Sequence, residues 1–201
     1  MLKKIGLGII LAIVVFIVMT FLKQKSYLKT FEYLKEPQMV SMPSQKMLVV
    51  EIKGDPNNTG KLAISELYKT LFILKKTYKE IKMAAPRSRW PKSFNIPKEE
   101  WVGLYGIPVS DTVEKLPEQK GNQKSQVKIA VWEYGEVAEI LHIGPYSEEN
   151  STVEILQKFI KDKGYKIIGD HEEDYIKGPG MIFKGNPKKY YTIIRYRVKK
   201  K

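Results

Sequence analysis

Glu173 and Tyr175, two residues apart, are the side chains best suited by type and spacing to bind a ligand. On a β-strand, residues two apart point to the same face of the sheet. A carboxylate attracts cations and repels anions, and a tyrosine ring stacks on a delocalised cation. The pair therefore predicts a site for a cationic small molecule. The alternative interpretation is a solvated acidic stretch, residues 170–174.

Other aromatic residues extend this hypothesis. Trp101 and Tyr105 alternate onto one face of a predicted strand, and Tyr146 follows a glycine–proline turn before a predicted helix. An internal repeat of the sequence aligns Tyr191 with Trp101. Each ring either contacts a ligand or packs in the core, and both interpretations stay open. The predicted ligand-binding set is Glu173, Tyr175, Tyr146, Trp101, Tyr105 and Tyr191.

Composition excludes several kinds of chemistry. The absence of cysteine excludes disulfides, thiol catalysis and cysteine-ligated metals. Two histidines, His142 and His171, are too few for an obvious metal cage, although His142 could be a haem ligand. No nucleophile set of Ser, His and Asp, or of Lys, stands at a motif spacing. The sequence therefore favours a binding protein over an enzyme, with no cofactor and no bound metal.

The chain is strongly basic, with a net charge of +13. A nucleic-acid-binding protein needs a basic patch together with an element that reads the nucleic acid. No helix-turn-helix, zinc finger or glycine-rich phosphate loop is recognisable in this sequence. We therefore expect solvated lysines that attract anionic lipid headgroups, and no nucleic-acid partner.

Residues 5–22 form an uninterrupted uncharged run, flanked by lysines on both sides. Its length approaches the roughly 20 residues that cross a bilayer core. This predicts a retained single-pass anchor in residues 1–26, with the lipid bilayer as a partner. The alternative is a cleaved signal peptide. The lysine distribution leans slightly towards a cytoplasmic domain.

Two stretches of the chain repeat each other at an offset of about 90 residues. Residues 50–54 align with 140–144, and residues 97–102 align with 187–192. We expect a stalk at 27–37 and a domain at 38–201, with halves of about 38–110 and 127–198. The predicted strands are 45–53, 101–109, 127–132, 136–143, 165–169, 173–177 and 190–198. One helix is predicted after Thr59, and another from a capping box at Ser151 and Glu154.

The second half carries a familiar signature. Residues 142–146 read HIGPY, followed by Gly164-Tyr165, then Glu173-Asp174-Tyr175 and Pro179. This order resembles the GyrI-like small-molecule-binding domains, which are also the effector-binding domains of multidrug-responsive transcription activators. The haem-binding SOUL proteins are similar in fold.

The resemblance implies an α+β fold. In it, two β-α-β-β halves with pseudo-twofold symmetry form one antiparallel sheet, with two helices packed on the sheet. It also implies a ligand groove between the halves, with Glu173 in or beside it. In this chain a transmembrane helix is predicted to precede that fold, where the activators have a DNA-binding domain.

These observations predict a membrane-anchored domain that binds or sequesters a hydrophobic, possibly cationic, small molecule. One alternative is a membrane-tethered protein-interaction module whose partner the sequence does not name. A second alternative is a hydrolase of strained apolar compounds, because some GyrI-like proteins with a pocket glutamate have that activity.

Overall fold

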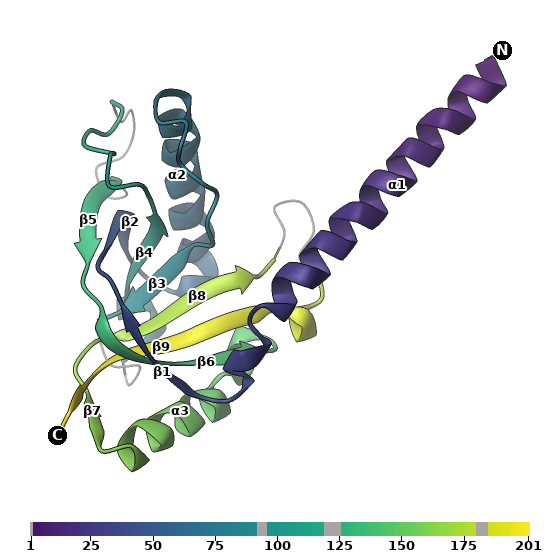
Figure 1. The fold of residues 1–201 in the computed structure, drawn as a ribbon. Coiled ribbons are helices and arrows are strands. Elements are labelled where there is room, and N and C mark those ends of the chain that lie inside the picture. Colours follow the sequence, from purple (N-terminus) through teal and green to yellow (C-terminus); the bar gives the residue numbers. More distant parts are fainter. Residues whose placement is uncertain (1, 92–95, 119–125, 180–184) are drawn as a thin grey trace.

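The computed structural model describes residues 2–91, 96–118, 126–179 and 185–201, with side chains from residue 14 onward except residue 17. Helices and strands follow one another along the chain as shown in Figure 1. They are α1 (Leu2–Lys29), the 3₁₀ turn η1 (Glu32–Lys35), β1 (Gln38–Met42), β2 (Gln45–Lys53), α2 (Pro56–Thr77), β3 (Arg87–Trp90), η2 (Lys98–Glu100), β4 (Val102–Pro108), β5 (Lys128–Trp132), β6 (Gly135–Ile143), η4 (Tyr146–Glu148), α3 (Asn150–Asp162), β7 (Tyr165–Ile167), β8 (His171–Lys177), η5 (Pro187–Lys189) and β9 (Tyr191–Lys200).

The strands form one antiparallel sheet whose order reads β1-β6-β9-β8-β3-β4-β2-β5, with β7 added on β9. This order is symmetric about the pair β8–β3, and each half gives its first strand to the other half. The predicted α+β class and the duplicated architecture are compatible with this fold. Each half has an additional leading strand, so that it reads β-β-α-β-β before β7 is counted.

Strands β1 and β3 were not among the predicted strands. β1 (Gln38–Met42) is a short segment between Pro37 and Pro43, and prolines favour a loop interpretation. β3 (Arg87–Trp90) reads Arg-Ser-Arg-Trp, and arginine is rarely expected in the interior of a sheet. Ion pairs of Arg87 and Arg89 with residues of β8 hold β3 inside the sheet, and a local sequence pattern does not reveal such long-range pairs.

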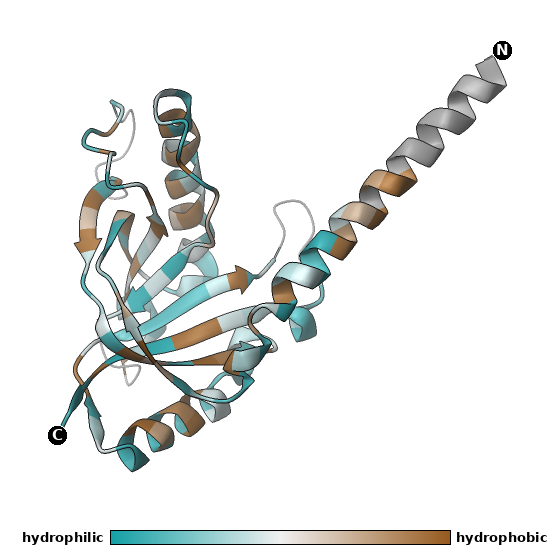
Figure 2. Cartoon of the chain, viewed as in Figure 1, coloured by the Kyte–Doolittle hydropathy of each residue, from teal (hydrophilic) through white to brown (hydrophobic). Residues whose placement is uncertain are grey.

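Both long domain helices cover the same face of the sheet. Leu67, Leu71 and Leu74 of α2 pack on β2 and β4, as the predicted apolar stripe requires. Leu156 and Ile160 of α3 pack on β6 and β9. In Figure 2, apolar residues, coloured brown, recur along these helices and along strands of the sheet. The gap between α2 and α3 therefore lies over the central strands β3 and β8.

The caps of these helices differ from the predicted ones. Helix α2 begins at Pro56, and the Asp55 side chain accepts a hydrogen bond from the Asn57 backbone N–H at 2.9 Å, so Thr59 is not the cap. Glu149 occupies the N-cap position of helix α3, and its side chain makes no capping hydrogen bond. The Glu149 side chain therefore does not hydrogen-bond the backbone N–H groups at the start of α3.

The opposite face of the sheet buries an ionic network. The Arg195 guanidinium donates to Glu139 at 2.8 Å and to Glu172 at 2.7 Å, and Arg89 donates to Glu172 at 2.6 Å. Arg87 pairs with Asp174 at 3.0 Å. These pairs join β3, β6, β8 and β9, and they explain why so many charged residues lie inside the sheet.

Helix α1 extends away from the sheet (Figure 1). Within residues 2–91 and the other described ranges, no helix is both long enough and apolar enough to cross a membrane. This finding contradicts the predicted membrane localisation, and it gives no support to the predicted transmembrane anchor or to the bilayer partner.

Candidate functional site

The central strand β8 presents alternate residues to the two faces of the sheet. His171, Glu173 and Tyr175 point to the face that carries the helices, whereas Glu172 and Asp174 join the ionic network on the other face. On the neighbouring strand β3, Trp90 is paired with His171 and Ser88 is paired with Glu173. The sheet's symmetry axis therefore places Glu173 between α2 and α3.

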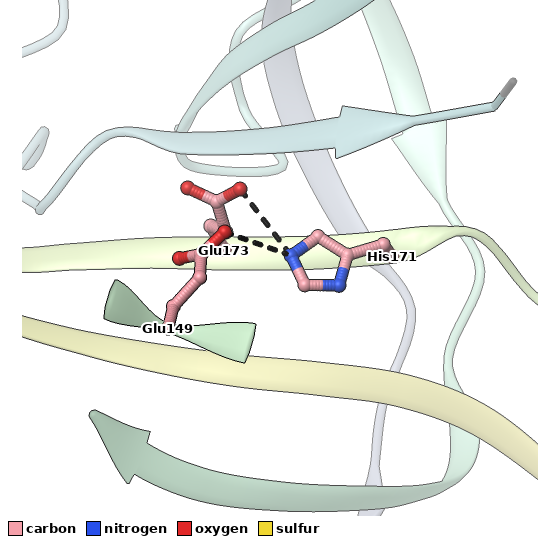
Figure 3. Close-up of side chains that lie close together, drawn as sticks. All are labelled: Glu149, His171 and Glu173. Atoms are coloured by element: carbon pink, nitrogen blue, oxygen red, sulfur yellow. Dashed lines mark ion pairs between the residues drawn. The ribbon is translucent and has the colours of Figure 1, made fainter. Parts of the chain in front are cut away.

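The Glu173 carboxylate lies beside two ring nitrogens. The indole N–H of Trp90 donates to Glu173 Oε1 at 2.8 Å. The His171 Nε2 atom lies 3.3 Å from the same oxygen. Only 8% of the Glu173 side chain is exposed, so the carboxylate is almost removed from water. Figure 3 shows this carboxylate beside His171 and a second carboxyl group, that of Glu149.

Glu149 reaches the cluster from the start of α3. Its Oε1 atom lies 4.0 Å from His171 Nε2 (Figure 3). Burial, and secondly the nearby Glu173 carboxylate, raises the pKa of Glu149 from 4.5 to about 9. Glu149 is therefore a neutral acid at pH 7.

Aromatic rings surround these groups. Trp90 makes edge contacts with Trp101 and with Tyr105, each at 5.7 Å between ring centroids. On the other side, Tyr146 contacts Tyr175 and Tyr190, each at 5.5 Å. We call these six rings, together with Glu149, His171 and Glu173, the aromatic–acidic cluster.

Three tyrosines of the cluster, Tyr105, Tyr146 and Tyr175, are neutral at physiological pH. Burial, reinforced by the Glu173 carboxylate, raises the pKa of Tyr105, Tyr146 and Tyr175 above the ordinary value of 10. The Tyr175 hydroxyl also shares a hydrogen bond of 2.7 Å with the Ser88 hydroxyl. The cluster thus presents carboxyl oxygens to a ligand, with aromatic rings around them.

Five of the six predicted site residues meet in this cluster, namely Glu173, Tyr175, Tyr146, Trp101 and Tyr105. Tyr191 does not; it packs against Leu34 and Leu141 on the other face. The repeat alignment was one residue out of register. Gly54 N–H bonds the Trp101 carbonyl and Gly144 N–H bonds the Tyr190 carbonyl, so Trp101 corresponds to Tyr190. A slip of one residue moves a strand side chain to the opposite face.

Sequence reasoning missed Glu149, His171, Trp90 and Tyr190. His171 stands two residues before Glu173, so the argument that joined Glu173 to Tyr175 would have found it. Glu149 carries no such local signal, because only the docking of α3 brings it to β8. His142, the haem-ligand alternative, lies beside Thr152 with its Nδ1 at 2.9 Å from the hydroxyl, outside the cluster.

The groove expected between the halves is filled by side chains. Trp90, Tyr105 and Tyr190 are each at most 6% exposed, whereas Tyr146 is 36% exposed at the edge of the cluster. Hollows of about 140 and 210 Å³ lie elsewhere, the first beside Arg195 and Arg197 on the other face, the second beside Tyr78 at the end of α2. Tyr146 is therefore the exposed ring of the cluster.

No family model and no curated protein sequence matches the chain. An uncharacterised conserved protein from Listeria innocua has 22% identity and a TM-score of 0.69, over 88% of this chain and 98% of that one. A hydrolase from Listeria innocua has 22% identity and a TM-score of 0.68 over the same shares. The EcmrR C-terminal domain has 17% identity and a TM-score of 0.57, over 83% of this chain and 98% of that domain.

At these identities the likeness shows a shared fold. The fold is consistent with the GyrI-like fold that residues 142–146 and 173–175 predict. The matches cover 98% of each of these three neighbours. The absence of a nucleic-acid partner remains a prediction.

Proposed function

We propose that this chain binds a hydrophobic organic cation at the aromatic–acidic cluster. The observation that carries the proposal is the Glu173 carboxylate, 8% exposed and enclosed by Trp90, Tyr175 and their neighbouring rings. A cation placed there gains attraction to the carboxylate and to the ring faces, and both strengthen where water is excluded. A neutral apolar compound gains only the contacts with the rings and no attraction to the carboxylate.

Tyr146 controls access in this proposal. It is the exposed member of the cluster, and its ring covers Tyr175 and Tyr190. Rotation of its side chain uncovers buried ring surface without disturbing the sheet. The fold shared with the EcmrR C-terminal domain supports small-molecule binding as the general activity.

A hydrolase is the second candidate, and Glu149 is the observation that favours it. A carboxylic acid with a pKa of about 9 beside a second carboxylate is a pair suited to give and accept a proton at neutral pH. One structural neighbour is named a hydrolase. The expected substrate is a strained apolar compound; as its ring bond breaks, Glu149 would give a proton to one carbon, water would add to the other, and Glu173 would accept the proton that this water loses. Glu149→Gln would abolish turnover and leave cation binding in place.

Titration of the intrinsic tryptophan fluorescence with tetraphenylphosphonium tests the binding proposal, because the Trp90 indole contacts Glu173. We expect saturable quenching that weakens at least tenfold in Glu173→Gln, since removal of a buried charge costs more than one hydrogen bond. The control is Glu148→Gln, whose side chain is exposed on the neighbouring 3₁₀ turn. Equal affinity for the neutral triphenylphosphine oxide, or an unchanged Glu173→Gln variant, would refute the proposal and point to the interaction-module alternative.

A further inference from the structure

Glu149, His171 and Glu173 lie together as potential ligands of a metal ion. Each offers one donor atom, and these three atoms all lie within 4.8 Å of one another. They come from the start of α3 and from two positions of β8 (Figure 3). From this geometry we propose that the three residues bind a divalent transition-metal ion of the Zn²⁺ type.

The distances suit such an ion. Zn²⁺ binds nitrogen and oxygen ligands at about 2.0–2.2 Å, which in a tetrahedral site separates two ligand atoms by roughly 3.3 Å. His171 Nε2 and Glu173 Oε1 are 3.3 Å apart. Nε2 and Glu149 Oε1 are 4.0 Å apart, and a small rotation of the Glu149 side chain shortens that distance. Three protein ligands leave the fourth position open.

A second layer of contacts orients the ligands. His171 Nδ1 is 2.8 Å from the Tyr196 hydroxyl, so that Nε2 is the nitrogen directed at the carboxyl groups. The Trp90 indole N–H donates to Glu173 Oε1 and fixes that carboxylate. Bonds of this kind to the far nitrogen of a histidine and to a ligating carboxylate are typical of protein metal sites.

The surroundings favour a small, highly charged ligand. His171 and Glu173 are 4% and 8% exposed, and Glu149 Oε2 is a buried oxygen that accepts no hydrogen bond from the described residues. Two carboxyl groups close together away from water repel each other once both are ionised, and a divalent cation removes that repulsion. An ion also needs no displacement of Tyr146, because it fits between side chains that already meet.

The donor set discriminates among ions. One imidazole and two carboxylates suit Zn²⁺ and its first-row neighbours. Ca²⁺ prefers six to eight oxygen ligands, and Mg²⁺ prefers six oxygens and retains most of its water. We therefore expect Zn²⁺ to bind and Mg²⁺ to fail to bind.

The proposal is independent of organic-cation binding, but both ligands would use Glu173, so Zn²⁺ should compete with tetraphenylphosphonium.

Zinc titration of the full chain, by calorimetry and against a chromophoric chelator, tests the proposal. The two histidines provide a matched pair of variants. We expect a single Zn²⁺ site per chain whose affinity falls at least tenfold in His171→Gln and is unchanged in His142→Gln, because His142 lies outside the cluster. Co²⁺ should bind the wild-type chain with the visible absorption of a tetrahedral ion and should give no such spectrum with His171→Gln.

Glu149→Gln is the second variant, and it decides the question if His171→Gln does not fold. It replaces the buried acid by an amide of nearly the same shape and removes one ligand, so it should fold and lose zinc affinity at least tenfold. Absence of saturable zinc binding, or equal binding by the wild-type chain and both variants, would overturn the proposal. Tetraphenylphosphonium titrations of the same samples report organic-cation binding separately, so failure of one proposal is distinguishable from failure of the other.

Discussion

Replacement of Glu149 by glutamine should stabilise the protein at neutral pH. The pKa of Glu149 rises from 4.5 to about 9 on folding, because the side chain is buried and Glu173 is near. Between these two pH values the unfolded chain has released this proton and the folded chain retains it. The free energy of unfolding therefore falls as pH rises through this window. Glutamine, which is neutral at every pH, removes that dependence.

The magnitude follows from the shift. Each pH unit in the window costs about 1.4 kcal/mol, so the deficit accumulated between pH 4.5 and pH 7 is roughly 3 kcal/mol. This value is an upper bound, since relaxation around a buried carboxylate reduces it. The free energy of unfolding of Glu149→Gln should exceed that of the wild-type chain by up to this amount at pH 7, and by less than about 1 kcal/mol at pH 5.

Urea unfolding followed by circular dichroism from pH 5 to pH 9 measures both curves. Other titrating groups act on both proteins, so the difference between the curves isolates Glu149. Glu148→Gln is the matched control, because its side chain faces solvent one residue away. A Glu149→Gln variant that is less stable than the wild-type chain at pH 7, or a difference that does not vary with pH, would show that the fold does not hold Glu149 neutral.

The remaining predictions concern access, charge and packing. Tyr146→Ala should speed association and dissociation of tetraphenylphosphonium in stopped-flow fluorescence, because Tyr146 covers the cluster. Raising pH through about 9 should tighten cation binding as Glu149 ionises; a flat profile in titrations at pH 7 to 10 would contradict this. Arg195→Met should lower the free energy of unfolding by about 3–5 kcal/mol in urea titrations, because Glu139 and Glu172 lose their shared partner. Gly103→Ala should lower Tm, because a Cβ atom there would lie 2.7 Å from the Tyr105 ring and 3.0 Å from the Trp90 ring.

Local sequence patterns predicted the parts of the site that share a strand or a repeat. Residues two apart on a strand face the same way whatever the rest of the fold does, and so Glu173 and Tyr175 were paired correctly. The same rule covered Trp101 and Tyr105, which now meet around Trp90. The rule failed for Tyr191, because a one-residue error in the repeat reverses the face.

The prediction for the uncharged N-terminal run, residues 5–22, was limited in a different way. Its composition alone predicted an anchor, yet no helix of the described residues is both long enough and apolar enough to cross a membrane.

The sequence by itself determined the duplicated α+β architecture, the strand that carries Glu173 and most of the aromatic residues around it. These follow from periodicity and from the internal repeat, which are local properties of the chain. Only the tertiary structure decided that Glu149, from the start of α3, meets His171 and Glu173. That meeting depends on how α3 packs on β6 and β9, and the pKa of Glu149 depends on the burial that results. Burial and long-range proximity are properties of the folded chain, and no spacing in the sequence records them.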